Sequence, residues 1–143
     1  VEHMLKVVFD TVIFVRALLG PHSFSGRLLF EYLRDYRLFI SASVVEEILE
    51  VLGRKEIIKR FHLRQKNLPE AMARLIKSMN RAEIIQVDKI PAISRDMKDD
   101  KFLATAKAAQ ADYLVSADKD LLDLKEYKGI KIITAEEFLK IIE

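Results

Sequence analysis

Short apolar runs alternate with longer stretches of helical periodicity along the whole chain. The apolar runs are four or five residues long and most are rich in β-branched side chains, so we predict a buried strand at each of them. They cover residues 5–9, 38–41, 83–87, 113–116 and 130–133. Strands that are apolar throughout and separated by helices are typical of a parallel sheet covered on both faces. We therefore predict an α/β fold, a three-layer α/β/α sandwich around a five-stranded parallel sheet.

Start and stop signals mark the helices between these strands. The predicted helices cover residues 12–19, 26–36, 43–53, 54–66, 67–80, 99–110, 118–124 and 134–143, and residues 88–98 are predicted to form a loop. Ser25 is expected to cap the second of these helices. Ser43 with Glu46, and Thr134 with Glu137, have the spacing of a capping box, in which a hydroxyl and a carboxylate satisfy backbone N–H groups at a helix start.

The composition fits one folded domain. Of the 143 residues 50% are hydrophobic, and there is no cysteine, which excludes a disulfide framework and thiolate metal sites and favours a reducing cytoplasm. No apolar run approaches the roughly 18 residues that a membrane span needs, and no secretory signal is visible, so we expect a cytoplasmic protein with no membrane partner. Residues 1–3 are interpreted as a remnant before a native start at Met4, which leaves a single domain of residues 4–143.

The net charge of +2 neither requires nor excludes a nucleic-acid partner. The cations are concentrated in residues 54–66, where six Lys or Arg stand against one Glu. A solvated helix face and a phosphate-contacting surface explain this segment equally well. The candidate phosphate contacts are Arg54, Lys55, Lys59, Arg60 and Arg64.

Four acidic residues fall where predicted strands end or where neighbouring helices begin. Asp10 closes the first strand, and Asp118 follows the fourth by two residues. Glu47 lies near the start of the helix after the second strand, and Asp100 lies in the first turn of the helix before the fourth. Ligands of an open parallel sheet bind beyond the carboxyl ends of its strands, where the strand order reverses. We therefore expect these acids to converge on one edge of the sheet.

Carboxylates gathered in one pocket repel one another, which raises their pKa values unless a positive charge lies among them. A hard cation such as Mg²⁺ or Mn²⁺ is the natural partner of oxygen ligands, and such a site suits phosphodiester hydrolysis. Each acid also has a structural interpretation, as a helix cap, a surface residue or a charge at a helix N-terminus. Their shared location favours the functional interpretation.

Four sequence blocks stand out: VVFDTVIF at residues 7–14, IS at 40–41 with EI at 47–48, DDKFLA at 99–104 and YLVSADKDLL at 113–122. With these blocks the chain resembles, over almost its whole length, the PIN-domain nucleases, in particular the VapC-like toxins of toxin–antitoxin systems. The last two blocks are the more specific. The resemblance implies a divalent-metal-dependent endoribonuclease that hydrolyses RNA phosphodiester bonds, a homodimer, and an antitoxin partner that blocks the acidic groove.

The resemblance also implies roles for residues of this chain. The catalytic acids that it implies are Asp10, Glu47, Asp100 and Asp118. The three aspartates are expected chiefly to coordinate Mg²⁺ or Mn²⁺, and the glutamate to ligate a metal or orient the attacking water. The supporting residues that it implies are Thr11, Ser116 and Asp120, with the serine hydroxyl orienting the site.

One position departs from the family pattern. PIN domains usually have Asn two residues after the first Asp, and here Val12 stands there. Valine neither donates nor accepts a hydrogen bond, and loss of such a supporting contact weakens metal binding roughly 10–100-fold. We expect reduced activity, and the alternative is a module that binds RNA or a protein partner without cutting.

Other enzyme classes of similar architecture lack their required residues here. The four glycines, Gly20, Gly26, Gly53 and Gly129, form neither the GxGxxG of a dinucleotide site nor a Walker loop. Val12 takes the place of the second Asp of haloacid-dehalogenase-like phosphatases, and a receiver domain needs an acidic pair where only Asp10 stands. No HExxH pattern indicates a zinc hydrolase, and His22 and His62 are expected at the surface.

Overall fold

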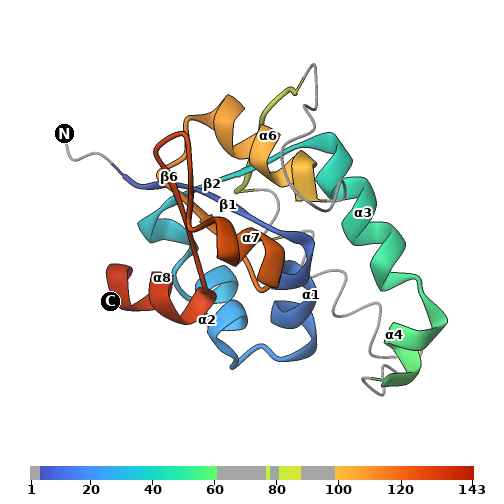
Figure 1. Ribbon diagram of the computed structural model, residues 1–143. Helices are drawn as coiled ribbons and strands as arrows, with labels where there is room; N and C mark the ends of the chain where they lie inside the picture. Colours follow the sequence, from blue (N-terminus) through green and yellow to red (C-terminus); the bar gives the residue numbers. More distant parts are fainter. Residues whose placement is uncertain (1–3, 61–76, 78–80, 88–98) are drawn as a thin grey trace.

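The computed structural model describes residues 4–60, 77, 81–87 and 99–143, in which six short strands form one sheet with helices on both faces (Figure 1). The strands are β1 (Lys6–Phe9), β2 (Arg37–Ile40), β3 (Glu83–Ile84), β4 (Tyr113–Val115), β5 (Glu126–Tyr127) and β6 (Ile130–Ile133). The helices are α1 (Thr11–Leu19), α2 (Phe24–Phe30), the 3-10 helix η1 (Leu33–Asp35), α3 (Ala42–Leu52), α4 (Lys55–Arg60), α6 (Asp100–Ala109), α7 (Lys119–Leu124) and α8 (Ala135–Ile142). The predicted three-layer α/β/α fold is confirmed.

The strand order is β3-β2-β1-β4-β6-β5, and neighbouring strands are parallel except β5 and β6. From β1 the chain builds outward through β2 and β3, and it then returns to the other side of β1 to add β4 and β6. The order therefore reverses between β1 and β4, whose register places Phe9 opposite Val115. The residues that follow these two strands meet at the carboxyl edge, where a parallel sheet binds its ligands.

Packed aromatic rings join β1 to the helices beneath it. The ring centroid of Phe9 lies 5.6 Å from that of Phe14 in α1 and 5.8 Å from that of Tyr36, which in turn lies 5.3 Å from Phe138 of α8. All four side chains are buried. Because Phe9 is fixed in this core, the next residue, Asp10, has a fixed position at the end of the strand.

The sheet has six strands, whereas the sequence predicted five. The additional strand, β5, is two residues long and pairs antiparallel with β6 across the turn Lys128-Gly129, whose φ angles are 49° and 85°. Positive φ at both turn residues gives the hairpin turn that matches the twist of its strands. Two residues are too few to show an alternating pattern. β3 also has only two residues, Glu83–Ile84, and is shorter than the strand predicted at residues 83–87.

The predicted cap of the second helix is wrong. The structure starts α2 at Phe24, because the Ser23 hydroxyl accepts a hydrogen bond from the Gly26 N–H at 3.1 Å, while Ser25 is buried. The helix ends at Phe30 rather than at residue 36. Both serines fit the local signal, and packing against the preceding turn decides between them.

The two predicted capping boxes have different outcomes. The box at Ser43 is wrong: α3 starts one residue earlier, and the Ser43 hydroxyl lies 3.2 Å from the hydroxyl of Ser41. The box at Thr134 is confirmed, since Glu137 N–H donates to the Thr134 hydroxyl at 3.1 Å and the Thr134 N–H donates to Glu137 Oε1 at 3.0 Å.

Some predictions fall outside the described residues. The helix predicted at residues 54–66 is described as far as Arg60, as α4. The predicted helix at residues 67–80 lies outside them except for Lys77, as do the predicted loop at 88–98 and His62. His22 is exposed, as predicted. No helix in the described part of the chain is long and apolar enough to cross a membrane.

Gly26 gives a test of this packing. A Cβ atom there would lie 2.4 Å from the Pro21 carbonyl oxygen and 2.5 Å from that of Gly20, both backbone atoms. We expect Gly26→Ala to lower the free energy of unfolding by about 1–3 kcal/mol, because the overlap outweighs the higher helix propensity of alanine. Urea denaturation measures the difference.

Gly53→Ala is the matched control. Its Cβ would meet no heavy atom nearer than 3.5 Å, and its φ of −82° suits any residue. This variant should be neutral or gain up to about 1 kcal/mol. Equal effects of the two substitutions would contradict the close approach of the 20–21 turn to α2.

Candidate active site

Asp10 lies between the ends of β1 and β4 and is only 2% exposed. Its Oδ1 accepts a hydrogen bond from the Ile13 N–H at 3.0 Å and thereby caps α1. Its Oδ2 accepts two more, from the Ser116 hydroxyl at 2.5 Å and from the Ala117 N–H at 3.1 Å. The carboxylate is thus a helix cap and also the contact that joins the two strand ends.

Burial raises the pKa of Asp10 above its ordinary value of 3.8, because removing a carboxylate from water disfavours its charged form. The hydrogen bonds from Ser116, Ala117 and Ile13 lower the pKa and offset part of this effect. The negative charge of Asp118 raises the pKa further.

The turn after β4 positions Asp118. Its N–H donates to the Ser116 hydroxyl at 2.9 Å, so the same hydroxyl that bonds to Asp10 also fixes the backbone of Asp118. Asp118 Oδ1 accepts from the Asp120 N–H at 2.8 Å and from the Leu121 N–H at 3.3 Å, which caps α7. One serine therefore connects two carboxylates that come from different strands.

Three carboxylates form a group that we call the acidic cluster: Asp99, Asp118 and Asp120. Each offers one oxygen atom, and these atoms lie within 4.8 Å of one another. Asp99, directly before α6, is 5% exposed, and the other two are half-buried. The donors are all carboxylate oxygens, the ligands that hard divalent cations prefer. The cluster therefore fits Mg²⁺ or Mn²⁺ better than a thiophilic metal.

Glu47 is held by two contacts from other elements. Thr11, at the start of α1, donates a hydrogen bond from its hydroxyl to Glu47 Oε2, and Lys101 Nζ lies 2.8 Å from Glu47 Oε1. The side chains of Glu47 and Lys101 are each 22% exposed. In α6 the Thr105 hydroxyl also bonds to the Ser41 hydroxyl at 3.0 Å, which joins α6 to the start of α3. Glu47 is thus fixed in place.

A cavity of about 310 Å³ adjoins this edge. Ser116 and Ala117 form part of its wall, and Arg16 and Phe24 line it from α1 and α2. Phe24 is 47% exposed, and Arg16 is exposed and forms no ion pair within the described residues. A cation and an aromatic ring thus line a cavity that is also bordered by Glu136 and by Ser116, the hydrogen-bond donor to Asp10.

The structure brings together most of the residues that the sequence selected. Asp10, Ser116 and Asp118 form one hydrogen-bonded chain, Thr11 bonds to Glu47, and Asp120 lies in the acidic cluster with Asp118. Asp100 is buried at the start of α6 but, among the described residues, it is not a member of the cluster.

Asp99 and Lys101, the chain neighbours of Asp100, are the residues that the sequence reasoning missed. Asp99 carries the same local signal as Asp100, since both lie at a helix start. The contact between Lys101 and Glu47 joins residues 54 positions apart, and no spacing rule reveals it.

The candidate phosphate contacts of the basic segment are only partly described. The Arg54 guanidinium donates bidentate hydrogen bonds to the Glu50 carboxylate, at 2.7 and 2.9 Å. Lys55 and Lys59 are exposed. The side chain of Arg60 and the whole of Arg64 lie outside the described part of the chain.

Residues 6–120, which include every acid of the site, match the sequence profile of the PIN domain. The chain belongs to the PIN domain family. PIN domains are generally nucleases that use divalent metals, so the family supports hydrolase activity for this member.

Relatives of this PIN domain protein come from archaea and bacteria. An uncharacterized protein, MJ1680 of Methanocaldococcus jannaschii, is 26% identical over 97% of this chain and 92% of its own length. The crystal structure of PAE2754 from Pyrobaculum aerophilum has a TM-score of 0.62 at 18% identity, covering 96% of this chain and 95% of that one. VapBC2 from Rickettsia felis, in a structure bound to a DNA fragment from their promoter, has a TM-score of 0.57 at 16% identity, covering 90% and 97%. These two structures show that the fold is shared.

The buried carboxylate predicts an unusual pH dependence. Because the pKa of Asp10 is raised on folding, the folded state holds the proton more tightly, and this residue's contribution to stability falls as pH rises above the ordinary value of 3.8. With EDTA present to exclude metal ions, Asp10→Asn should remove this loss of stability with rising pH. Thermal unfolding of both proteins from about pH 4 to pH 7 measures the difference in slope. Glu46→Gln, an exposed carboxyl on α3, is the control, and an identical slope in wild type and Asp10→Asn would refute the assignment.

Proposed function

We propose that this protein is a divalent-metal-dependent endoribonuclease that hydrolyses RNA phosphodiester bonds. The observation that carries the proposal is the convergence of carboxylates from β1, β4, α6 and α7 at the carboxyl edge of a PIN-domain sheet. Folding gathers like charges there and buries three of the acids almost completely, Asp10, Asp99 and Asp100, which is unfavourable unless the site has a positively charged ligand.

The acidic cluster, Asp99, Asp118 and Asp120, would hold Mg²⁺ or Mn²⁺. The sequence predicted Asp10, Asp100 and Asp118 as the chief metal ligands. We propose Asp99 in place of Asp100, and Asp120 as a further ligand, because one oxygen of each lies within 4.8 Å of an oxygen of Asp118. When bound, such an ion can generate a hydroxide nucleophile and stabilise charge on phosphoryl oxygens.

The remaining acids act through their fixed positions. Asp10, restrained by the hydrogen bonds to both its oxygens, adds negative charge beside Asp118. Glu47 orients the attacking water, because Thr11 and Lys101 fix its carboxylate and leave it partly accessible.

An RNA substrate is supported by the cavity that borders Ser116 and Ala117, the residues between the end of β4 and Asp118. Phe24 presents an exposed aromatic face on which a base of a single strand can stack, and the Arg16 guanidinium can contact phosphate. A base and a backbone contact next to the carboxylates would place a phosphodiester at the site of cleavage.

The proposed biological role is that of a toxin paired with an antitoxin, in the cytoplasm. The support is the family together with the fold shared with VapBC2 of Rickettsia felis. An antitoxin segment that occupies the carboxyl edge would block the acids, and a homodimer is the assembly that we propose by the same resemblance.

RNA cleavage tests the activity. Purified protein with single-stranded RNA and Mn²⁺ should give fragments, and EDTA should abolish them. Asp118→Asn should lower the rate by at least about a hundredfold, since it removes a ligand charge while asparagine still caps α7. Fragment analysis on denaturing gels measures the rate. Cleavage that persists in EDTA, or that is unaffected by Asp118→Asn, would contradict the proposal.

Val12 distinguishes a weakened nuclease from a module that only binds. Its side chain is 40% exposed in the first turn of α1, so Val12→Asn removes little from the core. We expect this variant to cut RNA up to roughly 10–100-fold faster in limiting Mn²⁺, because an amide at this position restores a tether to the acids. Retention of RNA with no cleavage in either protein would favour the binding module.

A further inference from the structure

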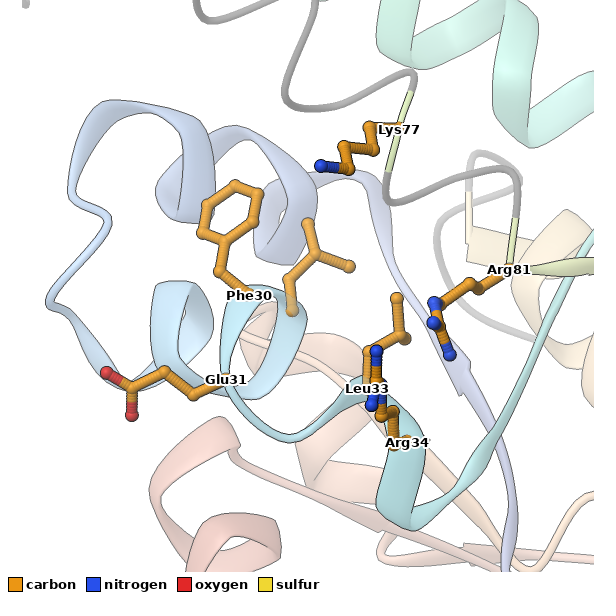
Figure 2. A pocket seen from close by; sticks show the side chains of 7 residues that line it. Phe30, Glu31, Leu33, Arg34, Lys77 and Arg81 are labelled. Atoms are coloured by element: carbon orange, nitrogen blue, oxygen red, sulfur yellow. The ribbon is translucent and has the colours of Figure 1, made fainter.

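A second cavity of about 310 Å³ lies at the opposite, amino edge of the sheet (Figure 2). Its apolar lining comes from Leu29, Phe30 and Leu33, and its basic lining from Arg34, Lys77 and Arg81. Arg34 belongs to η1, directly before β2, and Arg81 precedes β3. Because the acids follow the carboxyl ends of the strands, a strand of four residues, about 13 Å, separates the two edges.

The three cations of this cavity have no acidic partner in the described part of the chain. Within the described residues, Arg34, Lys77 and Arg81 form no ion pair. Glu31 also borders the cavity, but its carboxylate pairs with Arg27 at 3.5 Å. Figure 2 shows that carboxylate pointing away from the basic side chains. Three positive charges around one hollow repel each other, and an anion bound among them would relieve the repulsion.

The acid of the adjoining cavity, Glu83, does not pair with these cations. Arg34 and Arg81 also line an adjoining cavity, together with Arg37 and Glu83. Both oxygens of Glu83 are taken by the Arg37 guanidinium, at 2.7 and 2.8 Å, and this contact holds the pKa of Glu83 below its usual value. The carboxylate of Glu83 is therefore already paired with Arg37.

The apolar wall narrows the choice of anion. Leu29 is buried, and Phe30 and Leu33 are partly buried against the core. A hollow of this size with one aromatic wall suits a flat ring, whereas inorganic phosphate alone would leave the apolar side unused. Guanidinium groups match phosphate oxygens in pairs, and two of them lie here.

We propose that this cavity binds a nucleotide unit, with its phosphate on Arg34, Lys77 and Arg81 and its base against Phe30 and Leu33. The unit comes either from a single strand of RNA or from a free mononucleotide. In the first case the cavity anchors the strand while the acids cut at the other edge, and this case rests on the proposed function.

Binding measured without metal tests the proposal independently of cleavage. Fluorescence anisotropy of labelled single-stranded RNA in EDTA is compared for wild type, Arg34→Gln, Arg81→Gln and the double variant. Each substitution removes a charge at nearly constant size, and Lys131→Gln removes an exposed cation elsewhere as the matched control. Thermal unfolding establishes that each variant is folded. Adenosine monophosphate, inorganic phosphate and an acidic peptide serve as competitors.

Both sources of the nucleotide predict measurable losses. For an RNA strand, each single variant should bind at least about tenfold more weakly, and the slope of log affinity against log salt should fall by about 0.7 per lost phosphate contact. For a free nucleotide, the same variants should lose affinity for adenosine monophosphate measured by calorimetry, while RNA binding is unchanged. The control variant should match wild type in both assays.

Three results would overturn the proposal: unchanged affinity of the double variant for both probes, equal losses in the control variant, or displacement by an acidic peptide where adenosine monophosphate fails. The last result would assign the cavity to an acidic protein segment. If wild type cuts RNA but the variants bind normally, only this inference fails. If the variants lose nucleotide binding but wild type never cuts RNA, the proposed function fails and the cavity assignment stands.

Discussion

Ser116 donates a hydrogen bond to a carboxylate that is almost completely removed from water, that of Asp10, and this contact joins the ends of the two central strands. The same hydroxyl accepts a hydrogen bond from the Asp118 N–H, and Asp10 in turn caps α1. The ends of β1 and β4 and the starts of α1 and α7 therefore form one hydrogen-bonded unit. Its acids hold their positions because the backbone at the strand ends holds them.

The electrostatics of this unit favour a bound cation. Three donors to Asp10 compensate for only part of the loss of hydration, so its pKa stays raised, and the charge of Asp118 raises it further. The acidic cluster concentrates more negative charge at the same edge. A divalent ion would stabilise every one of these charged forms, so metal binding and the stability of the edge are coupled. Without such an ion, burial and the charge of Asp118 favour the protonated form of Asp10.

The sequence predicts the layers of the fold and the edge that carries the site, because both follow from long-range rules. Apolar strands between helices require a parallel sheet, and parallel strands place Asp10 and Asp118 at one edge. Choices between near neighbours are different, since Ser23 and Ser25, or Ser41 and Ser43, carry the same local signal. The Ser23 hydroxyl caps α2, whereas α3 starts after Ser41 with no side-chain cap, and the local sequence distinguishes neither case. The two-residue strand β5 gives no pattern to detect.

The same limit applies inside the site. Asp99 and Asp100 are adjacent at the start of α6, and of the two only Asp99 belongs to the acidic cluster within the described residues. The ion pair of Lys101 with Glu47 depends on how α6 packs against α3, which no spacing in the sequence encodes. Residue type and strand position thus predict which edge of the sheet carries the candidate site. The tertiary structure is needed to identify which carboxylates lie close enough to share a metal ion.

Calorimetric titration of the metal-free protein with Mn²⁺ is the most direct test of the divalent site. We expect wild type to bind the ion, and Asp99→Asn and Asp118→Asn each to weaken binding at least about tenfold, because each removes one ligand charge. Weaker binding in Asp100→Asn but not in Asp99→Asn would reverse the choice between these neighbours. Affinity for Mn²⁺ that is unchanged in Asp118→Asn would contradict the account.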